Sequence, residues 1–165
     1  MRTRLAVLND TPTDGPKATL VIRLMTGSVF FWEGILKFVY PNQGVGRFTK
    51  IGFPMPVELA TFVALLEIIG GLCLLFGYRT RIVSALFIGQ MIVAILSTKI
   101  ALYLGTSPLP LPPAPPTVGM WAVLHESRAD VAQLLTCVFL FLAGPGPISL
   151  DARRVSRPAG EVSTS

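Results

Sequence analysis

The chain has 165 residues, of which 52% are hydrophobic and only 14% are charged, and its mean hydropathy is +0.63. These values favour a membrane protein, and the length leaves room for one domain of three or four spans with short connections. The single histidine, His125, excludes a bis-histidine haem site, and Cys73 and Cys137 both lie in apolar segments and form no C-x-x-C pair. The net charge of +5 comes from basic residues beside apolar runs, which indicates membrane topology rather than nucleic-acid binding.

Residues 1–17 are polar, so we expect a short disordered arm. The apolar stretch after it is too long for a signal peptide and has no small-residue cleavage site, so we expect that stretch to be retained. The first predicted span covers residues 20–40. Five of its residues share one helical face at steps of three and four: Arg23, Gly27, Phe30, Gly34 and Lys37. The charged side chains and the two glycines predict that this face contacts other helices rather than lipid.

Glu33 lies four residues before Lys37, in the favourable order for an ion pair along a helix. Two interpretations are open. In the first, Glu33 and Lys37 neutralise each other near the interface, with the lysine stem extended toward water. In the second, they line a polar pocket.

Residues 41–56 are expected to form a loop, punctuated by glycine and proline, whose apolar side chains rest on the membrane interface. The second predicted span, residues 57–78, carries Glu67 near its middle. A carboxylate at that depth costs about 2.5–3.5 kcal/mol, so the protein must supply a partner. The small residues Ala60, Ala64 and Gly71 share its face and predict helix packing there. The alternative is an isolated, protonated glutamate bonded to a backbone carbonyl.

A basic turn at residues 77–81 leads into the third predicted span, residues 82–104. Gln90 lies on the same face as Ala94, Ser97 and Ala101, whereas Lys99 lies about 180° away at 100° per residue. Lys99 either extends to the interface, which we favour, or shows that this helix has two faces covered by protein.

Residues 105–116 are proline-rich and are expected to be an extended external loop without a helix. Residues 118–124, with Trp121, are expected to lie flat at the interface. A polar cluster follows and includes Arg128 and Asp130. The fourth predicted span has only about 13 apolar residues, 131–143, and reaches full length if its helix begins near Ser127.

Lysine and arginine are distributed unevenly between the two ends of this four-helix arrangement. Eight lie on the side of both termini (Arg2, Arg4, Lys17, Arg79, Arg81, Arg153, Arg154, Arg157) and three on the other (Arg47, Lys50, Arg128). The positive-inside rule then predicts an all-α integral membrane four-helix bundle with both termini in the cytoplasm. We expect the bundle at residues 18–151, between the arm at 1–17 and a disordered cytoplasmic tail at 152–165.

The same layout places the polar groups at comparable depths and predicts one pocket that opens outward. Its candidate catalytic residues are Glu67, Glu33 and Lys37. Its candidate pocket or substrate-binding residues are Arg128, Asp130 and Gln90. No metal site and no covalently bound cofactor is expected.

Four stretches carry a resemblance to a known family: RLMTGSVFFWEGILKF at 23–38, IGFPMP at 51–56, ELATFVALLEIIGGLCLLFGYRTR at 58–81, and GPGPISLD at 144–151. In this order they resemble the DoxX family of small bacterial four-helix membrane proteins. The resemblance implies a multi-pass protein of the bacterial plasma membrane with a link to redox work. Relatives of that kind include membrane subunits of thiosulfate:quinone oxidoreductase and components of oxidative-stress membrane complexes.

Three classes of function remain open. The first is a quinone-linked redox subunit, in which cationic and hydroxyl donors polarise quinone oxygens, a buried carboxylate relays protons, and a cofactor-bearing partner protein supplies the electrons. The second is a non-catalytic scaffold or assembly factor that binds another membrane protein through small-residue faces. The third is a carrier of small solutes or lipids.

Overall fold

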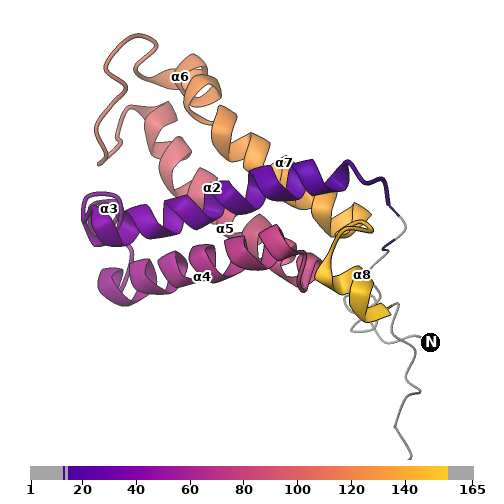
Figure 1. Ribbon diagram of the computed structural model, residues 1–165. Helices are drawn as coiled ribbons and strands as arrows, with labels where there is room; N and C mark the ends of the chain where they lie inside the picture. The colour runs from indigo at the N-terminus through magenta and orange to yellow at the C-terminus, as the bar shows by residue number, and fades with distance from the viewer. Residues whose placement is uncertain (1–12, 14, 156–165) are drawn as a thin grey trace, which may run out of the picture.

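The computed structural model describes residues 13 and 15–155, and over these residues every regular element is a helix (Figure 1). The predicted arm at 1–17 and tail at 152–165 therefore lie largely outside the described residues. In chain order the helices are α2 (Thr19–Val39), α3 (Val45–Ile51), α4 (Pro56–Phe76), α5 (Thr80–Leu104), α6 (Gly119–Glu126), α7 (Arg128–Ala143) and α8 (Leu150–Val155).

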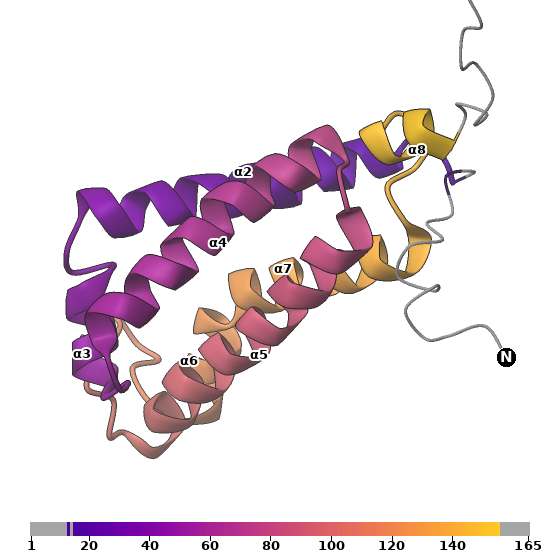
Figure 2. The ribbon, with the colours of Figure 1, turned by 90° about the horizontal axis from the view of Figure 1, so that it is seen from below.

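The fold consists of two helix pairs, because α2 packs along α4 and α5 packs along α7 (Figures 1 and 2). At one end of the bundle lie the beginning of α2, the α4–α5 turn and α8. At the opposite end lie α3, α6 and the proline-rich connection. The described ends of the chain therefore leave from the same end of the bundle.

Three helices, α2, α4 and α5, are long and apolar enough to cross a membrane. Their limits match the first three predicted spans to within two residues. The fourth predicted span corresponds to α7, which has 16 residues and begins at Arg128, beside Ser127, where the sequence suggested. Ser127 keeps helical backbone angles and links α6 to α7, so the two helices follow each other with one residue between them.

Two segments differ from expectation. The loop at 41–56 contains helix α3, in which Val45, Phe48 and Ile51 are spaced three residues apart, and Gly52 ends the helix with a φ of 85°. A left-handed residue at this position suits glycine. The second difference is α8, which continues helical structure past residue 151. The prediction that residues 105–116 contain no helix is confirmed.

The α2–α4 pair depends on small residues at the contact. A Cβ atom placed on Gly34 would lie 2.7 Å from the carbonyl oxygen of Ala64, and one on Gly71 would lie 2.7 Å from the backbone nitrogen of Phe31. Both distances are too short for any side chain, so the glycines permit this approach. The predicted packing of the Glu67 face of α4 against another helix is confirmed, and that helix is α2.

The two pairs meet through an aromatic contact. The rings of Phe30 on α2 and Phe87 on α5 stack with centroids 3.7 Å apart and planes inclined by 13°. Around them lie the other buried apolar residues of the core: Leu74, Val83, Met91, Cys137 and Leu140. Large apolar side chains such as Phe62 and Leu96 point outward from the same helices, as they should where lipid is the solvent.

Candidate functional site: a buried carboxylate held by lysine and glutamine

Glu67 lies at the middle of α4 and is 3% exposed. Its two carboxylate oxygens have different partners. Lys37 Nζ, from α2, lies 2.5 Å from Oε2, and Gln90 Nε2, from α5, donates a hydrogen bond to Oε1. Three helices thus converge on one carboxylate, and the expectation that the protein supplies a partner for Glu67 is confirmed.

Lys37 lies near the end of α2, and its long side chain brings its ammonium group to the level of Glu67. Side chains on a helix tilt toward its N-terminus. The Lys37 stem follows that direction, and its Nζ also lies 3.4 Å from the backbone oxygen of Glu33, one turn earlier. The ammonium group, rather than the backbone of Lys37, is therefore what enters the membrane interior.

Gln90 reaches the same depth from the other helix pair. It lies ten residues into α5, or about 15 Å along the axis at 1.5 Å per residue. Its amide donates to Glu67, but its own Oε1 is buried and accepts no hydrogen bond within the part of the chain that the structure describes. A buried acceptor without a donor is unfavourable by about 1–3 kcal/mol. A hydrogen bond from a hydroxyl or amine group to this atom would therefore be favourable.

The glycines that follow Glu67 give the site its shape. Gly71 allows α2 to approach α4. A Cβ atom on Gly70 would lie 2.6 Å from the ring of Phe87 on α5. The E-x-x-G-G motif of residues 67–71 therefore places an acid where two other helices can both come close to it.

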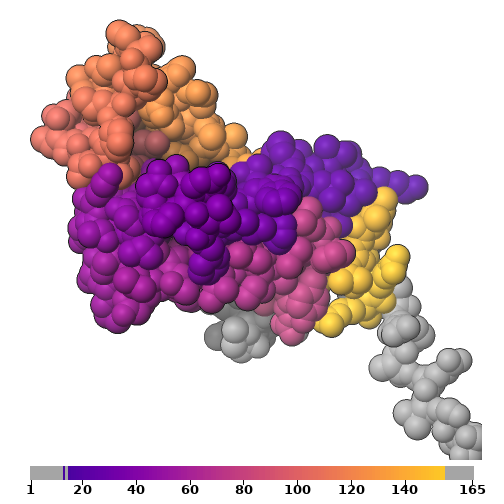
Figure 3. All heavy atoms as spheres, turned by 60° about the vertical axis from the view of Figure 1, so that its left-hand side comes forward, coloured from indigo at the N-terminus to yellow at the C-terminus, as the bar shows by residue number. Residues whose placement is uncertain are grey.

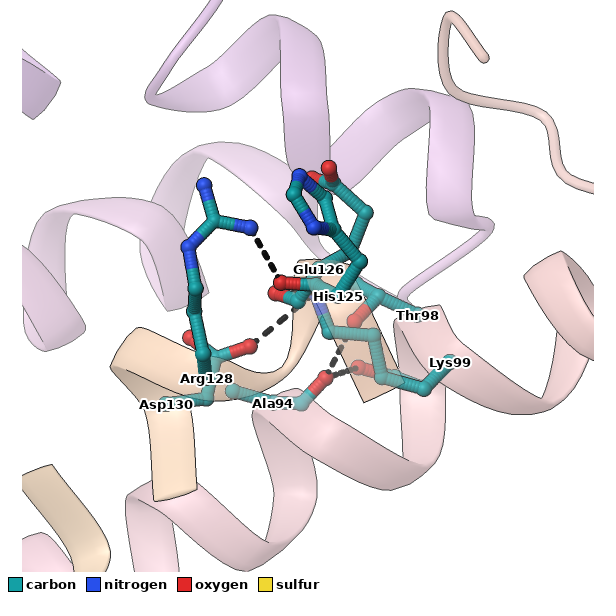
Figure 4. Close-up of polar contacts among 8 residues, drawn as sticks. Ala94, Thr98, Lys99, His125, Glu126, Arg128 and Asp130 are labelled. Atoms are coloured by element: carbon teal, nitrogen blue, oxygen red, sulfur yellow. Dashed lines mark hydrogen bonds and ion pairs between the residues drawn. The ribbon is translucent and has the colours of Figure 1, made fainter. Parts of the chain in front are cut away.

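The remaining predicted site residues do not join this group. Glu33 is exposed, and Lys37 forms its ion pair with Glu67 instead of with Glu33. Arg128 is exposed and donates to the backbone oxygen of His125, at the end of the bundle that holds α6 (Figure 4). Asp130 forms its ion pair with Lys99 at 3.0 Å. The structure therefore forms two polar clusters where the sequence suggested a single pocket.

The second cluster corrects the interpretation of Lys99. Instead of extending toward water, Lys99 is mostly buried between α5 and α6–α7, and its Nζ also donates to the backbone oxygen of Glu126 at 3.0 Å (Figure 4). Helix α5 thus has two faces covered by protein, one carrying Gln90 and the other Lys99. The clusters lie nine residues apart along α5, about 13 Å on its axis.

Sequence reasoning missed a third polar group, at the opposite end of the bundle. Arg23 is 2% exposed, and its guanidinium donates to the backbone oxygens of Pro145 (2.8 Å) and Leu75 (3.2 Å). Asp151 accepts hydrogen bonds from the backbone N–H groups of Arg79 (2.9 Å) and Thr80 (3.1 Å). Two features of the sequence could have predicted this group. Arg23 shares a helical face with Gly27 and Gly34, and the G-Y-R-T-R and G-P-G-P-I-S-L-D stretches both lie at this end of the bundle.

An all-helical chain with three helices able to span a membrane and a charged cluster between them is a helical membrane protein. The DoxX family profile matches residues 18–100, and the chain belongs to the DoxX family. No solved structure matches it.

Two relatives cover most of the chain. The "Uncharacterized membrane protein Rv3486" of Mycobacterium tuberculosis (strain ATCC 25618 / H37Rv) is 38% identical over 152 residues, which cover 88% of this chain and 86% of the relative. The "Putative oxidoreductase CatD" of Bacillus subtilis (strain 168) is 32% identical over 133 residues, which cover 81% of this chain and 84% of the relative.

Proposed function

We propose that this DoxX protein is a membrane subunit of a redox system that binds quinone at the Glu67–Lys37–Gln90 cluster and handles protons there. The observation that carries the proposal is the buried carboxylate held by a lysine from α2 and an amide from α5. Ionisable residues inside a membrane protein mark substrate or proton pathways by default. The name of the Bacillus subtilis relative, "Putative oxidoreductase CatD", points in the same direction.

The chemistry of the three side chains suits a quinone. The oxygens of a quinone accept hydrogen bonds, and the Lys37 ammonium and the Gln90 amide are donors. The hydroxyls of a quinol donate, and Glu67 and the unpaired Gln90 Oε1 are acceptors. Reduction of one quinone to a quinol takes two electrons and two protons. In this proposal a cofactor-bearing partner protein supplies the electrons, Glu67 passes protons, and exposed Glu33 exchanges them with water.

The proposal includes a topology. Helices α2, α4, α5 and the α6–α7 segment form four spans in the bacterial plasma membrane, with both termini in the cytoplasm and the pocket open to the outside. The eight-to-three division of basic residues supports this orientation.

The scaffold alternative requires a face of small residues that is free to bind another protein, and in α4 this face is not free. The small residues of α4 that were free to bind another membrane protein are occupied by α2 inside this chain. A scaffold function would need one of the outward apolar faces instead, and those faces suit lipid equally well.

The first test is quinone content. Wild-type protein purified from membranes in mild detergent should release quinone into an organic extract and should bind an added short-chain quinone. Glu67→Gln and Gln90→Leu should each weaken binding at least ten-fold, since a hydrogen bond to a charged group is worth about 1.5–3 kcal/mol. Glu67→Gln should remain folded because the amide keeps the shape of the side chain. Both variants leave Lys37 without its carboxylate, at a cost of about 3–5 kcal/mol, but Glu67→Ala should fold poorly because it also removes the group that fills the site and binds Gln90.

The matched control is Lys99→Gln, which removes the other buried lysine and leaves the cluster intact. It should bind quinone as the wild type does, whereas Lys37→Gln should not. Thermal unfolding of every variant separates loss of binding from loss of fold. Wild-type protein without bound quinone and without affinity for added quinone would refute the proposal, as would undiminished binding by folded Glu67→Gln.

A further inference from the structure

A hollow on the outer surface of α4 begins at Ile69, two residues after Glu67, and extends toward α8. It has a volume of about 230 Å³ and is lined by Ile69, Leu72, Cys73, Phe76, Tyr78 and Leu150. The first four come from α4, Tyr78 from the turn after it, and Leu150 from the beginning of α8. Figure 3 shows the C-terminal segment, in yellow, against the pink end of the α4–α5 turn. Ile69 and Phe76 are 59% and 61% exposed, so the hollow opens toward the surroundings of the bundle.

Positive charge lies at one rim of this hollow. The guanidinium carbon of Arg154 lies 4.6 Å from the centre of the Tyr78 ring, in a cation–π contact. Arg79 follows Tyr78 in the chain and is exposed. Hydrogen bonding and positive charge from Arg79 and Arg154 lower the pKa of the Tyr78 phenol.

These two arginines have no acidic partner among residues 13 and 15–155. Asp151 is close by, but it is 8% exposed and its carboxylate accepts the N–H groups of Arg79 and Thr80. Asp151 thus caps a helix and leaves the guanidinium groups available to an external anion.

We propose that this hollow and its arginine rim bind an anionic phospholipid, with an acyl chain in the hollow and the phosphate against Arg79 and Arg154. Helix α4 ends at Phe76, and lipid headgroups lie at the ends of membrane spans. The arginines therefore lie where the phosphate of a bound lipid would be, and the hollow lies where its acyl chain would be. Basic pockets beside membrane helices bind anionic headgroups by the same pairing of charge and apolar surface. Neither part alone suffices, because a zwitterionic lipid lacks the net charge and an inorganic anion lacks the chain.

The test uses the full chain in detergent micelles, to which dioleoylphosphatidylglycerol, dioleoylphosphatidylcholine or inorganic phosphate is added. Bound lipid is counted by native mass spectrometry and the unfolding temperature is measured in parallel. Phosphatidylglycerol should bind and raise the unfolding temperature more than phosphatidylcholine does. Arg79→Gln and Arg154→Gln should each weaken phosphatidylglycerol binding about five-fold, from about 1 kcal/mol per basic residue near a charged lipid, and the double variant about 25-fold.

Two further variants separate charge from structure. Arg154→Lys keeps the charge and should retain most of the binding, whereas Arg47→Gln removes a basic residue from the opposite end and should change binding less than two-fold. Equal binding of the two lipids, unchanged binding by the double variant, or the same arginine-dependent effect from inorganic phosphate would each overturn the proposal. A dimer that phosphatidylglycerol does not displace would overturn it as well, because a second copy of the chain would then occupy the hollow.

Discussion

At the end of the bundle that holds the α4–α5 turn and α8, single charged residues join the helices without forming conventional ion pairs. Arg23 donates to the carbonyl oxygens of Leu75 and Pro145, and it thereby joins α2 to the end of α4 and to the segment after α7. Asp151 accepts the first N–H groups of α5, which have no acceptor inside that helix. The return hydrogen bond, from the N–H of Asp151 to the carbonyl oxygen of Gly77, is 2.9 Å long. Arg23 and Asp151 thus bind backbone groups that lie at or beyond the ends of helices, while Arg23 Nε is buried without a partner among the described residues.

Replacement of Asp151 should therefore lower stability and leave the distant Glu67 cluster intact. Asp151→Ala removes both capping hydrogen bonds and should lower the free energy of unfolding by about 1–2 kcal/mol, the usual cost of a lost helix cap. Asp151→Asn keeps one acceptor oxygen and should cost less. Unfolding in mixed micelles measures both variants. Glu58→Gln, at an exposed residue in the first turn of α4, is the control and should change stability by less than about 0.5 kcal/mol. Equal effects of Asp151→Ala and Glu58→Gln would contradict the capping role.

At the scale of helices, the α2–α4 contact brings two backbones close together. Gly27 and Gly34 on α2 face Gly71 and Ala64 on α4, and little space remains between the two backbones. Without a hydrophobic driving force between helices in lipid, such close packing supplies much of the association energy. The Lys37–Glu67 ion pair therefore joins two helices that glycine residues allow to pack closely.

Two glycines on different helices give a matched comparison. Gly34→Ala should separate α2 from α4 and destabilise the protein by about 1–3 kcal/mol, because the new methyl group meets backbone atoms at 2.7–2.9 Å. Gly89→Ala, on α5, meets nothing within 4 Å and should be neutral or stabilising by about 0.5–1 kcal/mol. Thermal unfolding of both variants in one detergent checks the difference. A Gly34→Ala variant as stable as Gly89→Ala would show that α2 and α4 can separate without cost.

At the scale of the whole molecule, the described chain enters and leaves at the same end of the bundle (Figure 1). This arrangement needs an even number of membrane crossings, and the α6–α7 segment is the candidate for the fourth. Reporter fusions after Ser107 and after Ser165 should report opposite sides of the membrane, with the second in the cytoplasm, because basic residues accumulate on the side of the termini. Two fusions on the same side would contradict the four-span topology.

The long apolar helices could be predicted from sequence because length and hydropathy determine them almost alone. The pairing of Glu67 with its neighbours was only partly predictable. The depth of Glu67 in the membrane predicts that it has a partner. Which residue is that partner depends on how the helices are rotated, and sequence periodicity does not give the rotation of α2 relative to α5. For that reason Lys37 and Gln90 proved to be neighbours of Glu67, while Arg128 and Asp130 did not. Helix α3 was missed because seven residues between glycines carry little periodic signal, although the spacing of Val45, Phe48 and Ile51 was a clue.

The ion pairs of the two polar clusters are arranged so that each helix pair contains an acid and a base that bind each other. Lys37 on α2 pairs with Glu67 on α4, the next long helix, and Lys99 on α5 pairs with Asp130 on α7. During synthesis the chain emerges from its N-terminus, so the first pair is complete before α5 has been made. The insertion of an unpaired lysine or glutamate near the middle of a bilayer costs free energy. The insertion of a hairpin in which the two residues are paired costs much less. Each half of the molecule can therefore enter the membrane with its own lysine–carboxylate pair formed, and neither pair depends on a charge from the other half.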